Sequence, residues 1–261
     1  MSDLAEAVIV SREPAPRLRR HVHAVYDYHE LRGPRQQRET PFPGAAVILN
    51  LGPPLDFPDG RRTSFVGGLT DRPIRFETPG HQRGVQANLT VLGAFRFFGV
   101  PMHWLSNCTV ELEDVLGADA RRLVERLADE PNPDARLDVL ETSLASRIEA
   151  GPSPESEVAW AVGRLAETDG SVRIASLSEE LGWSRKRLIA RFREQVGLPP
   201  KRLARLLRFH RVVRTLERDE ARLAEVAYAC GFADQSHLDR EFRSFAGTTP
   251  SEFLAAYSRR R

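Results

Sequence analysis

The feature that most constrains this chain is a helical unit that is written twice between Ser171 and Tyr257. The first copy reads IASLSEELGWSRKRLIARFREQVGLPP and the second reads LAEVAYACGFADQSHLDREFRSFAGTTP. Corresponding positions are as follows: Ile174, Leu177, Leu181 and Gly182 recur 49 residues later as Leu223, Val226, Cys230 and Gly231, and Ser184, Leu188, Phe192, Gly197 and Pro200 recur 50 residues later as Asp234, Leu238, Phe242, Gly247 and Pro250. The offset between the two copies changes from 49 to 50 residues in the turn, where an inserted residue costs the least stability. Such a repeat predicts two copies of one supersecondary unit.

Each copy has the pattern of a helix-turn-helix. A short apolar-periodic helix is predicted to end at Gly182 or Gly231, because glycine readily takes the left-handed conformation that closes a helix. Ser184 or Asp234 then provides a side-chain oxygen that can cap a second helix. Apolar residues four apart in that second helix share one face. The residues predicted to pack inward are Trp183, Leu188, Phe192, Phe232, Leu238 and Phe242.

The outward face of each second helix is basic and polar. A buried stripe opposite Arg, Lys, Gln, Ser and His suits the DNA major groove, where these side chains can reach base edges or phosphate. The alternative is a solvated face on a structural helix, but two matched copies with the same cap, turn and stripe argue against it. The predicted DNA-binding residues are Arg185, Lys186, Arg187, Ile189, Ala190, Arg193, Gln235, Ser236, His237, Arg240 and Arg243.

This region resembles the DNA-binding domain of the AraC/XylS family of transcription regulators. The stretch GFADQSHLDREFRSFAGTTPSEF matches the second-repeat signature of that family, and GWSRKRLIARFREQVGLPP fits its first repeat. The resemblance implies two helix-turn-helix units that are joined by a long helix and enter successive major-groove segments, about 34 Å apart. Here the joining helix is expected from Lys201 to about Arg218, with an apolar face made by Leu203, Leu206, Leu207, Val213 and Leu216.

The same resemblance implies a role for individual residues. The base-reading positions become Lys186, Ile189 and Ala190 in the first repeat, and Ser236, His237 and Arg240 in the second. Ile189 and Ala190 cannot hydrogen-bond a base, although they can touch a thymine methyl group. Recognition of the DNA sequence is therefore expected to depend mainly on the second repeat. Arg185, Arg187 and Arg193 are then left chiefly to hold phosphate.

The charge of the chain is divided unevenly. The total is +2, but the residues from Ser171 onward carry 19 basic and 11 acidic side chains, while the remainder carries 19 basic and 25 acidic ones. Only the C-terminal part is therefore expected to meet a polyanion. Two cysteines, Cys108 and Cys230, are too few for a disulfide scaffold. Together with the absence of a signal-peptide pattern and of a membrane-spanning run, they predict a cytoplasmic protein with no membrane partner.

The N-terminal half reads as β-rich. Short apolar or alternating segments bounded by Gly or Pro are typical of a small barrel or sandwich. Strands are expected at 45–51, 63–66, 73–78, 82–92 and 109–112, short helices at 93–99 and 118–127, and longer ones at 134–149 and 155–167. Residues 1–17 are expected to be loosely held and 32–44 to be a loop. Residues 18–31 are compatible with a short helix that leads into a strand, and periodicity does not decide between helix and strand there. We therefore predict an α+β chain, with a β-rich domain over 1–152 and an all-α double helix-turn-helix domain over 153–261.

Three segments of the N-terminal half, ILNLG, SFVGGL and PGHQRGVQANLTVLGAFRFFGVP, resemble the cupin-like or otherwise β-rich sensor domains fused to such DNA-binding domains. The resemblance implies a small-molecule effector or a homodimer, and RNA polymerase as a partner if the protein activates. An effector pocket lined by Phe65, Phe76, Phe95, Phe97 or Trp104 competes with the simpler interpretation that these aromatics are core. Dimerisation without any effector is a further alternative.

The principal rival is a cupin-type enzyme with a helical appendage. It requires converging histidines and carboxylates, and His21, His23 and Glu30 have the wrong spacing for a metal-binding cupin. We found no phosphate-binding glycine loop, nucleophile elbow or cysteine cluster, so no catalytic residue, metal ligand or cofactor is predicted. A protein–protein adaptor is a second rival. It predicts acidic or apolar outer faces on the second helices, which the arginines contradict. The most consistent hypothesis is a sequence-specific transcription regulator that is not an enzyme.

Overall fold

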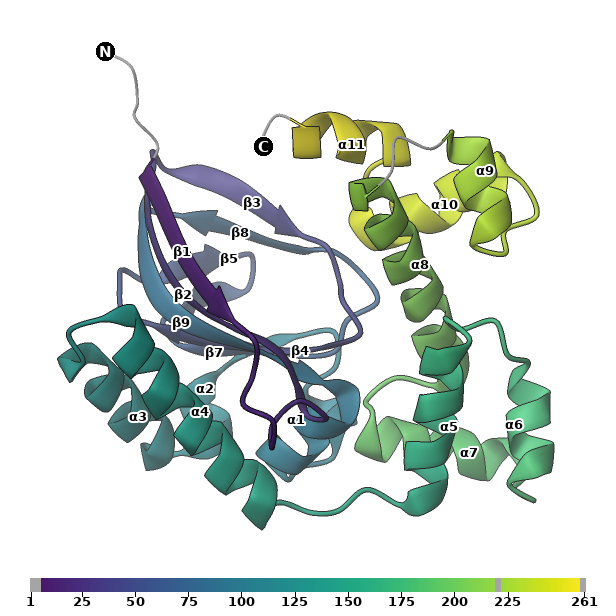
Figure 1. The fold of residues 1–261 in the computed structure, drawn as a ribbon, viewed down its shortest axis with the longest axis horizontal. Helices are drawn as coiled ribbons and strands as arrows, with labels where there is room; N and C mark the ends of the chain where they lie inside the picture. The colour runs from purple at the N-terminus through teal and green to yellow at the C-terminus, as the bar shows by residue number, and fades with distance from the viewer. Residues whose placement is uncertain (1–5, 219–221, 259–261) are drawn as a thin grey trace.

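The computed structural model describes residues 6–218 and 222–258, which form a β-rich N-terminal part followed by a helical C-terminal part (Figure 1). The strands are β1 (Glu6–Arg12), β2 (Val22–Leu31), β3 (Arg35–Glu39), β4 (Gly44–Asn50), β5 (Leu55–Phe57), β6 (Gly60–Arg62), β7 (Phe65–Gly67), β8 (Ile74–Thr78), β9 (His81–Thr90) and β10 (Thr109–Glu111). The helices are α1 (Val91–Phe98), the 3-10 turn η1 (Met102–Trp104), α2 (Leu112–Leu116), α3 (Ala118–Asp129), α4 (Pro133–Ala150), α5 (Ser156–Glu167), α6 (Ile174–Glu180), α7 (Arg185–Gln195), α8 (Pro200–Arg218), α9 (Leu223–Ala229), α10 (Gln235–Ala246) and α11 (Pro250–Ser258). Among these residues we find no helix that combines the length and the apolarity needed to cross a membrane.

The N-terminal part contains two antiparallel sheets. One has six strands in the order β1-β2-β9-β4-β7-β10, and the other has four in the order β3-β8-β5-β6. Alternation along β9 decides which side chains face which layer: Val85, Ala87 and Leu89 are fully buried in the core that packs against the helices of this part. Gln86 and Asn88 point instead into the space between the sheets. The predicted β-rich architecture is confirmed, and the described strands form two facing sheets rather than a closed barrel.

Two segments of the N-terminal part differ from the prediction. The expected loop at 32–44 contains β3, a polar edge strand whose register pairs Arg35 with Thr78 and Glu39 with Ile74. Its sequence, RQQRE, has neither alternation nor β-branched residues, so only pairing with β8 makes it a strand. The expected loose segment at 1–17 contains β1, which pairs with β2 along its whole length. Residues 1–5 of that prediction lie outside the described residues.

Two smaller differences from the prediction concern the start of β2 and a short hairpin. No helix precedes β2; a turn leads into it, closed by the amide of Val22 donating to the Leu18 carbonyl at 2.8 Å. The prediction also missed β5 and β6, a short hairpin with Gly60 at a φ of 134°. Three-residue strands carry too little periodicity to be distinguished from loops.

A buried ion pair ties the sheet to the helices. The guanidinium of Arg136 on α4 donates to both carboxylate oxygens of Asp27 on β2, at 2.5 and 3.0 Å. The side chains are only 7% and 6% exposed. Another N–H of Arg136 reaches the carbonyl of Glu130 at 3.0 Å. Such a two-point contact satisfies a carboxylate that would otherwise be very costly to bury.

The C-terminal part has one core that both helix-turn-helix copies share. The residues predicted to pack inward are buried there, including Leu188 and Phe242, which are fully buried. Helix α8 confirms the predicted joining helix. Its central contact was not predicted: the ring of Phe209 lies 5.1 Å from that of Phe242 and 5.0 Å from that of Phe245. Phe209 therefore fixes α10 against α8.

Candidate nucleic-acid interface

The first helix-turn-helix is built from α6 and α7. Helix α6 ends at Glu180 and is closed by Gly182, whose φ of 62° is left-handed. The chain then turns into α7, where the hydroxyl of Ser184 accepts a hydrogen bond from the amide of Arg187 at 3.2 Å. This contact satisfies one of the free N–H groups at the start of the helix. The predicted glycine closure and cap are confirmed in this copy.

The second unit repeats this geometry with α9 and α10. Gly231 has a φ of 76°, and the carboxylate of Asp234 accepts from the amide of His237 at 2.6 Å. A carboxylate at the start of a helix is also favoured by the helix dipole. Helices α7 and α10 lie near opposite ends of α8 (Figure 1). We call α7 and α10 the two reading helices.

Most predicted DNA-binding side chains are exposed on the reading helices. The exposed ones are Arg185, Lys186, Arg187, Ala190 and Arg193 on α7, and Gln235, Ser236, Arg240 and Arg243 on α10. Ile189 and His237 are half-buried. The cationic side chains of this set are exposed on α7 and α10, where a polyanion such as DNA can reach them.

Two of these side chains are held in place by aromatic neighbours. The guanidinium of Arg187 lies over the Trp183 ring, 4.3 Å from its centroid. The His237 ring meets the edge of Phe232 at 5.3 Å. Contacts of this kind reduce the conformational freedom that a side chain loses on binding. The side chains of Arg240 and Arg243 have no hydrogen bond or ion pair among the described residues, so they are available to a ligand.

The orientation of α10 depends on a clamp that the sequence did not reveal. Arg205 on α8 donates two hydrogen bonds to Glu241, both at 2.8 Å. Its guanidinium also lies 5.4 Å from the centroid of the Phe245 ring. A two-point arginine–carboxylate contact fixes direction as well as distance. The clamp therefore sets how the second reading helix leaves α8.

Two further arginines were missed by sequence reasoning. Arg173 and Arg222 are the residues that precede α6 and α9, and both are exposed. They occupy equivalent positions, one residue before Ile174 and Leu223. The repeat itself could have identified them, because an arginine at the same place in both copies is a candidate phosphate contact.

The N-terminal part holds a cavity of about 420 Å³ between its two sheets. Phe65 and Phe76 line it, as the sequence suggested, whereas Phe95 and Phe97 do not and Trp104 is 64% exposed on η1. The opposite wall carries Tyr26, Tyr28, Gln82, Gln86 and Asn88. Glu30 at this cavity is paired with Arg35 at 2.6 Å. Burial raises the pKa of Tyr28, so its phenol stays protonated.

The histidines do not converge with carboxylates. The Nε2 atoms of His29 and His81 lie 3.0 Å apart on neighbouring strands. Burial lowers the pKa of His21 and of His23, which stand at the start of β2. Glu30 is engaged with Arg35. The described residues contain no group of three or more His, Cys, Asp or Glu side chains placed to hold a metal ion.

Comparisons with known proteins agree with this geometry. Residues 177–256 match the family of helix-turn-helix domains. The HTH-type transcriptional activator RhaS of Escherichia coli (strain SE11) is 28% identical over 95 residues, which cover 36% of this chain and 33% of RhaS. The aligned region is thus about a third of the length of that relative.

Two solved structures extend the comparison. ToxT from Vibrio cholerae is similar over 96% of this chain and 98% of its own, with a TM-score of 0.50 and 12% identity, which shows a shared two-part fold. The DNA-binding domain of AdpA, solved in complex with a target DNA, is 32% identical and covers 42% of this chain and 97% of its own, with a TM-score of 0.36. Taken with the double helix-turn-helix geometry, the match over residues 177–256 identifies the C-terminal part of this chain as an AraC-type helix-turn-helix domain.

Proposed function

We propose that this chain is a sequence-specific DNA-binding transcription regulator that binds double-stranded DNA through residues 153–261. One observation carries the proposal: two units with the same type of cap and turn are joined by one helix, α8, and expose arginines from both reading helices. Phosphate contacts would supply most of the affinity, and base contacts the selection. The assigned roles are those stated above, with Ser236, His237 and Arg240 as the principal readers.

The comparisons favour this proposal over the cupin-type enzyme. RhaS, described above, is named a transcriptional activator, and the matched residues lie in the region that carries both reading helices. We extend DNA binding to this chain because its own surface suits it. The direction of regulation, activation or repression, is a property of each protein and its operator.

Selection of random duplex DNA by the purified full-length chain tests the proposal. We expect an enriched motif with two elements about one helical turn apart. Arg240→Ala should then lose preference at one or two base pairs of one element, by about 1–3 kcal/mol, because a base-edge contact is removed. The measurement is the affinity for the selected duplex and for its single-base variants.

Arg243→Ala is the matched control, since Arg243 is on the same helix and lies outside the proposed base-reading positions, so we propose that it contacts phosphate. It should weaken binding to all of the duplexes by a similar factor. Retention of full base discrimination by Arg240→Ala would contradict the assignment of Arg240. Salt-sensitive binding with no enriched motif would contradict sequence-specific function altogether.

We further propose that residues 1–152 bind a small effector in the cavity between the sheets. Three phenylalanines, Phe57, Phe65 and Phe76, form an aromatic wall, and amide and phenol groups form the wall opposite. The buried Nε2 of Gln82 has no hydrogen-bond partner, so it can donate to a ligand oxygen. Because Glu30 is already paired with Arg35, a cationic ligand would lose hydration and gain little from that carboxylate. A flat, neutral molecule with a carbonyl group fits best.

Matched aromatic compounds test this ligand class. We expect millimolar benzamide to raise the melting temperature of the full chain, and benzoate and benzamidinium, which have nearly the same shape, to leave it unchanged. Ala46→Phe, at a position that lines the cavity, should abolish the shift, whereas Ala128→Leu on the exposed surface of α3 should preserve it. A larger shift with either charged compound would contradict the proposed neutrality.

We also propose a homodimer, a contact with RNA polymerase if the protein activates transcription, and a cytoplasmic location. These proposals rest on the family resemblance and the composition. One feature of the described residues supports the dimer: β1 is an edge strand on which Val8 and Ile9 are 50% and 59% exposed. Exposed apolar edges favour pairing with another chain. Light scattering on the purified chain would decide between monomer and dimer, and cell fractionation would test the location.

A further inference from the structure

The N-terminal part touches the end of the first reading helix. Gly197, just after α7, has a φ of 99°. A Cβ atom added there would lie 2.2 Å from the hydroxyl oxygen of Ser106 and 3.0 Å from the carbonyl oxygen of Met102. The segment around η1 therefore packs directly against the backbone at the end of α7, with no room for a side chain between them.

A second contact reaches the core and the start of α8. Leu69, in the loop between β7 and β8, is only 2% exposed and belongs to the core of the C-terminal helices. Asp71 in the same loop forms an ion pair with Arg202 at 3.0 Å. Asn107, held at a φ of 59°, accepts hydrogen bonds from the hydroxyl of Thr70 at 3.0 Å and the amide of Asp71 at 3.1 Å. This loop is thus held in shape and anchored on the helical part.

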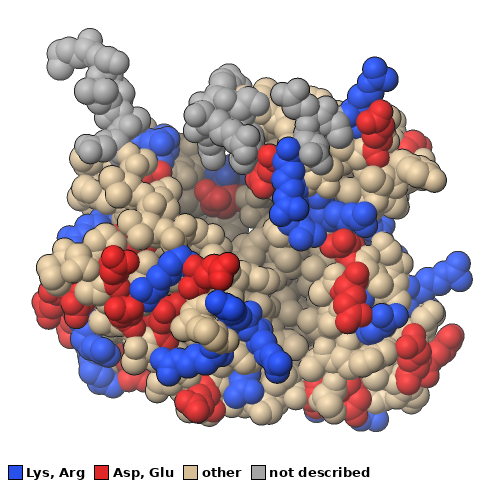
Figure 2. Space-filling view, in the orientation of Figure 1, with Lys and Arg blue, Asp and Glu red and all other residues tan. Residues whose placement is uncertain are grey.

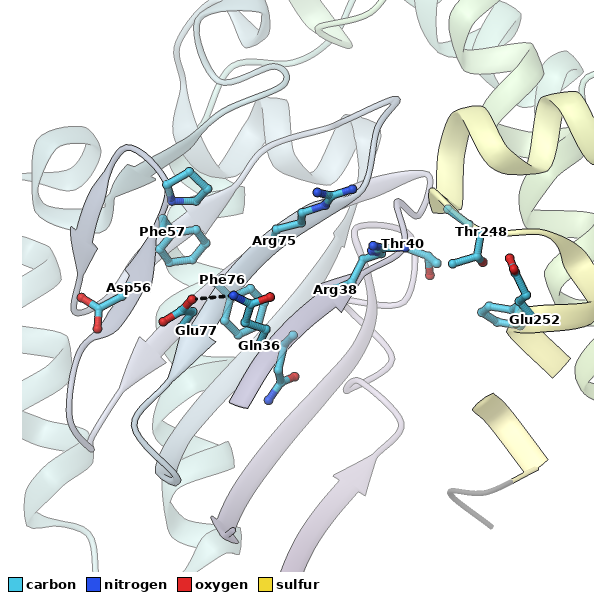
Figure 3. A pocket seen from close by; sticks show the side chains of 14 residues that line it. Gln36, Arg38, Thr40, Asp56, Phe57, Arg75, Phe76, Glu77, Thr248 and Glu252 are labelled. Atoms are coloured by element: carbon cyan, nitrogen blue, oxygen red, sulfur yellow. Dashed lines mark hydrogen bonds between the residues drawn. The ribbon is translucent and has the colours of Figure 1, made fainter. Parts of the chain in front are cut away.

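A third contact reaches the end of the second reading helix. The Nη1 of Arg38 on β3 donates to the carbonyl of Gly247 at 3.1 Å, and Gly247 closes α10 with a φ of 70°. A cation at this end of a helix is favoured by the helix dipole. Figure 3 shows Arg38 extending from the sheet toward the turn that carries Thr248, on the far side of a cavity of about 780 Å³.

These contacts leave the outward faces of the reading helices uncovered. Arg185, Lys186, Arg240 and Arg243 all remain exposed. On the face drawn in Figure 2 the space-filling view shows a hollow between the two parts of the molecule, and the cavity of about 780 Å³ is lined by residues of both parts. The N-terminal part therefore holds the ends of the reading helices without blocking their access to DNA.

We propose that the N-terminal part is a brace that sets the separation and relative orientation of the two reading helices, with Arg38 and Asp71 as positioning residues. This inference rests on the proposed DNA-binding function and goes beyond it. Successive major-groove segments lie about 34 Å apart. If the two reading helices are held at one fixed angle by their connecting helix, the protein fits only one spacing between the two DNA elements. Contacts at both ends of that connection restrict the angles that α10 can take relative to α7.

The spacing between the two DNA elements tests the brace. The selected duplex is compared with versions that have one base pair added or removed between the elements, a change of about 3.4 Å and a tenth of a turn. We expect the wild-type chain to bind the altered duplexes on the order of tenfold more weakly or worse. We call this loss of affinity for the altered duplexes the spacing penalty. Arg38→Ala should reduce the spacing penalty, and Arg38→Ala combined with Asp71→Ala should reduce it to about threefold or less.

Arg75→Ala is the matched control. Arg75 lies directly opposite Arg38 in the register of β3 and β8, and its side chain has no hydrogen bond or ion pair among the described residues. It should keep the wild-type spacing penalty. Arg38→Lys, which retains a cationic donor, should restore much of it. Melting temperatures of all variants separate the brace from a general loss of stability, because unfolding lowers binding to every duplex equally.

The outcomes distinguish this inference from the function on which it rests. Absence of any enriched motif would remove the proposed function. An enriched motif whose spacing penalty is unchanged in the Arg38 and Asp71 variants would overturn the brace and leave the function standing. Equal relaxation by Arg75→Ala and Arg38→Ala would also overturn it, since the effect would then come from charge rather than from the contact with Gly247.

Discussion

Raising the salt concentration from 50 to 200 mM should weaken DNA binding by roughly a thousandfold. The outward faces of the two reading helices carry the cations Arg185, Lys186, Arg187, Arg193, Arg240 and Arg243. If all six cations, the base-reading Lys186 and Arg240 included, displace counterions from the DNA, the log–log slope of affinity against salt is about −5. Fluorescence anisotropy with the selected duplex, at four or more salt concentrations, measures this slope.

Variants test whether the cations of the reading helices cause this salt dependence. Arg193→Gln together with Arg243→Gln should flatten the slope by about two, because each phosphate contact contributes about 0.9. Arg126→Gln should leave the slope unchanged, since Arg126 is exposed on α3 in the N-terminal part. A wild-type slope near zero, or an equal effect of Arg126→Gln, would show that the reading helices do not supply the phosphate contacts.

Arg136→Met should destabilise the β-rich part by about 3–5 kcal/mol, because it leaves Asp27 buried without its counter-charge. Both side chains are almost fully buried and joined by two hydrogen bonds. Hydrogen exchange of the β2 amides, in wild type and variant, measures the free energy of unfolding locally. This readout is needed because a chain with two parts need not unfold in one step.

A second variant separates loss of the ion pair from loss of packing. Asp27→Leu combined with Arg136→Met removes both charges and should recover most of the stability, as apolar replacements of buried pairs often do. Arg122→Met is the control for an exposed pair: Arg122 and Asp119 are 66% and 52% exposed, so the change should cost less than about 1 kcal/mol. Equal losses in Arg136→Met and in the double variant would show that packing, not charge, makes this site stable.

The helix-turn-helix units could be predicted because their determinants lie close together in the chain. A left-handed glycine, a capping side chain two or three residues later and an apolar pair four residues apart all act within one unit, and Ser184 and Asp234 cap as expected. The candidate DNA-binding residues followed from the same pattern, since a buried stripe determines which side chains face outward. The repeat also contains Arg173 and Arg222, whose matching positions directly before α6 and α9 become apparent only in the structure.

The β-rich part was predicted only in outline. Buried or alternating strands such as β4 and β9 are visible in sequence because their apolar residues are close together. Strand β3 is not, because its residues are polar and its structure comes from pairing with β8, some 40 residues away. Edge strands depend on their neighbours more than on their own composition.

The sequence by itself therefore determined the two helix-turn-helix units, the basic faces of their second helices and a β-rich first half. Only the tertiary structure decided the contacts between residues far apart in the chain. Arg136 meets Asp27 across 109 residues, and Arg38 meets Gly247 across 209. Local preferences act over one or two turns of chain and repeat with a period that can be read directly. A contact between distant residues depends on how whole sheets and helices pack, which no short stretch of sequence records.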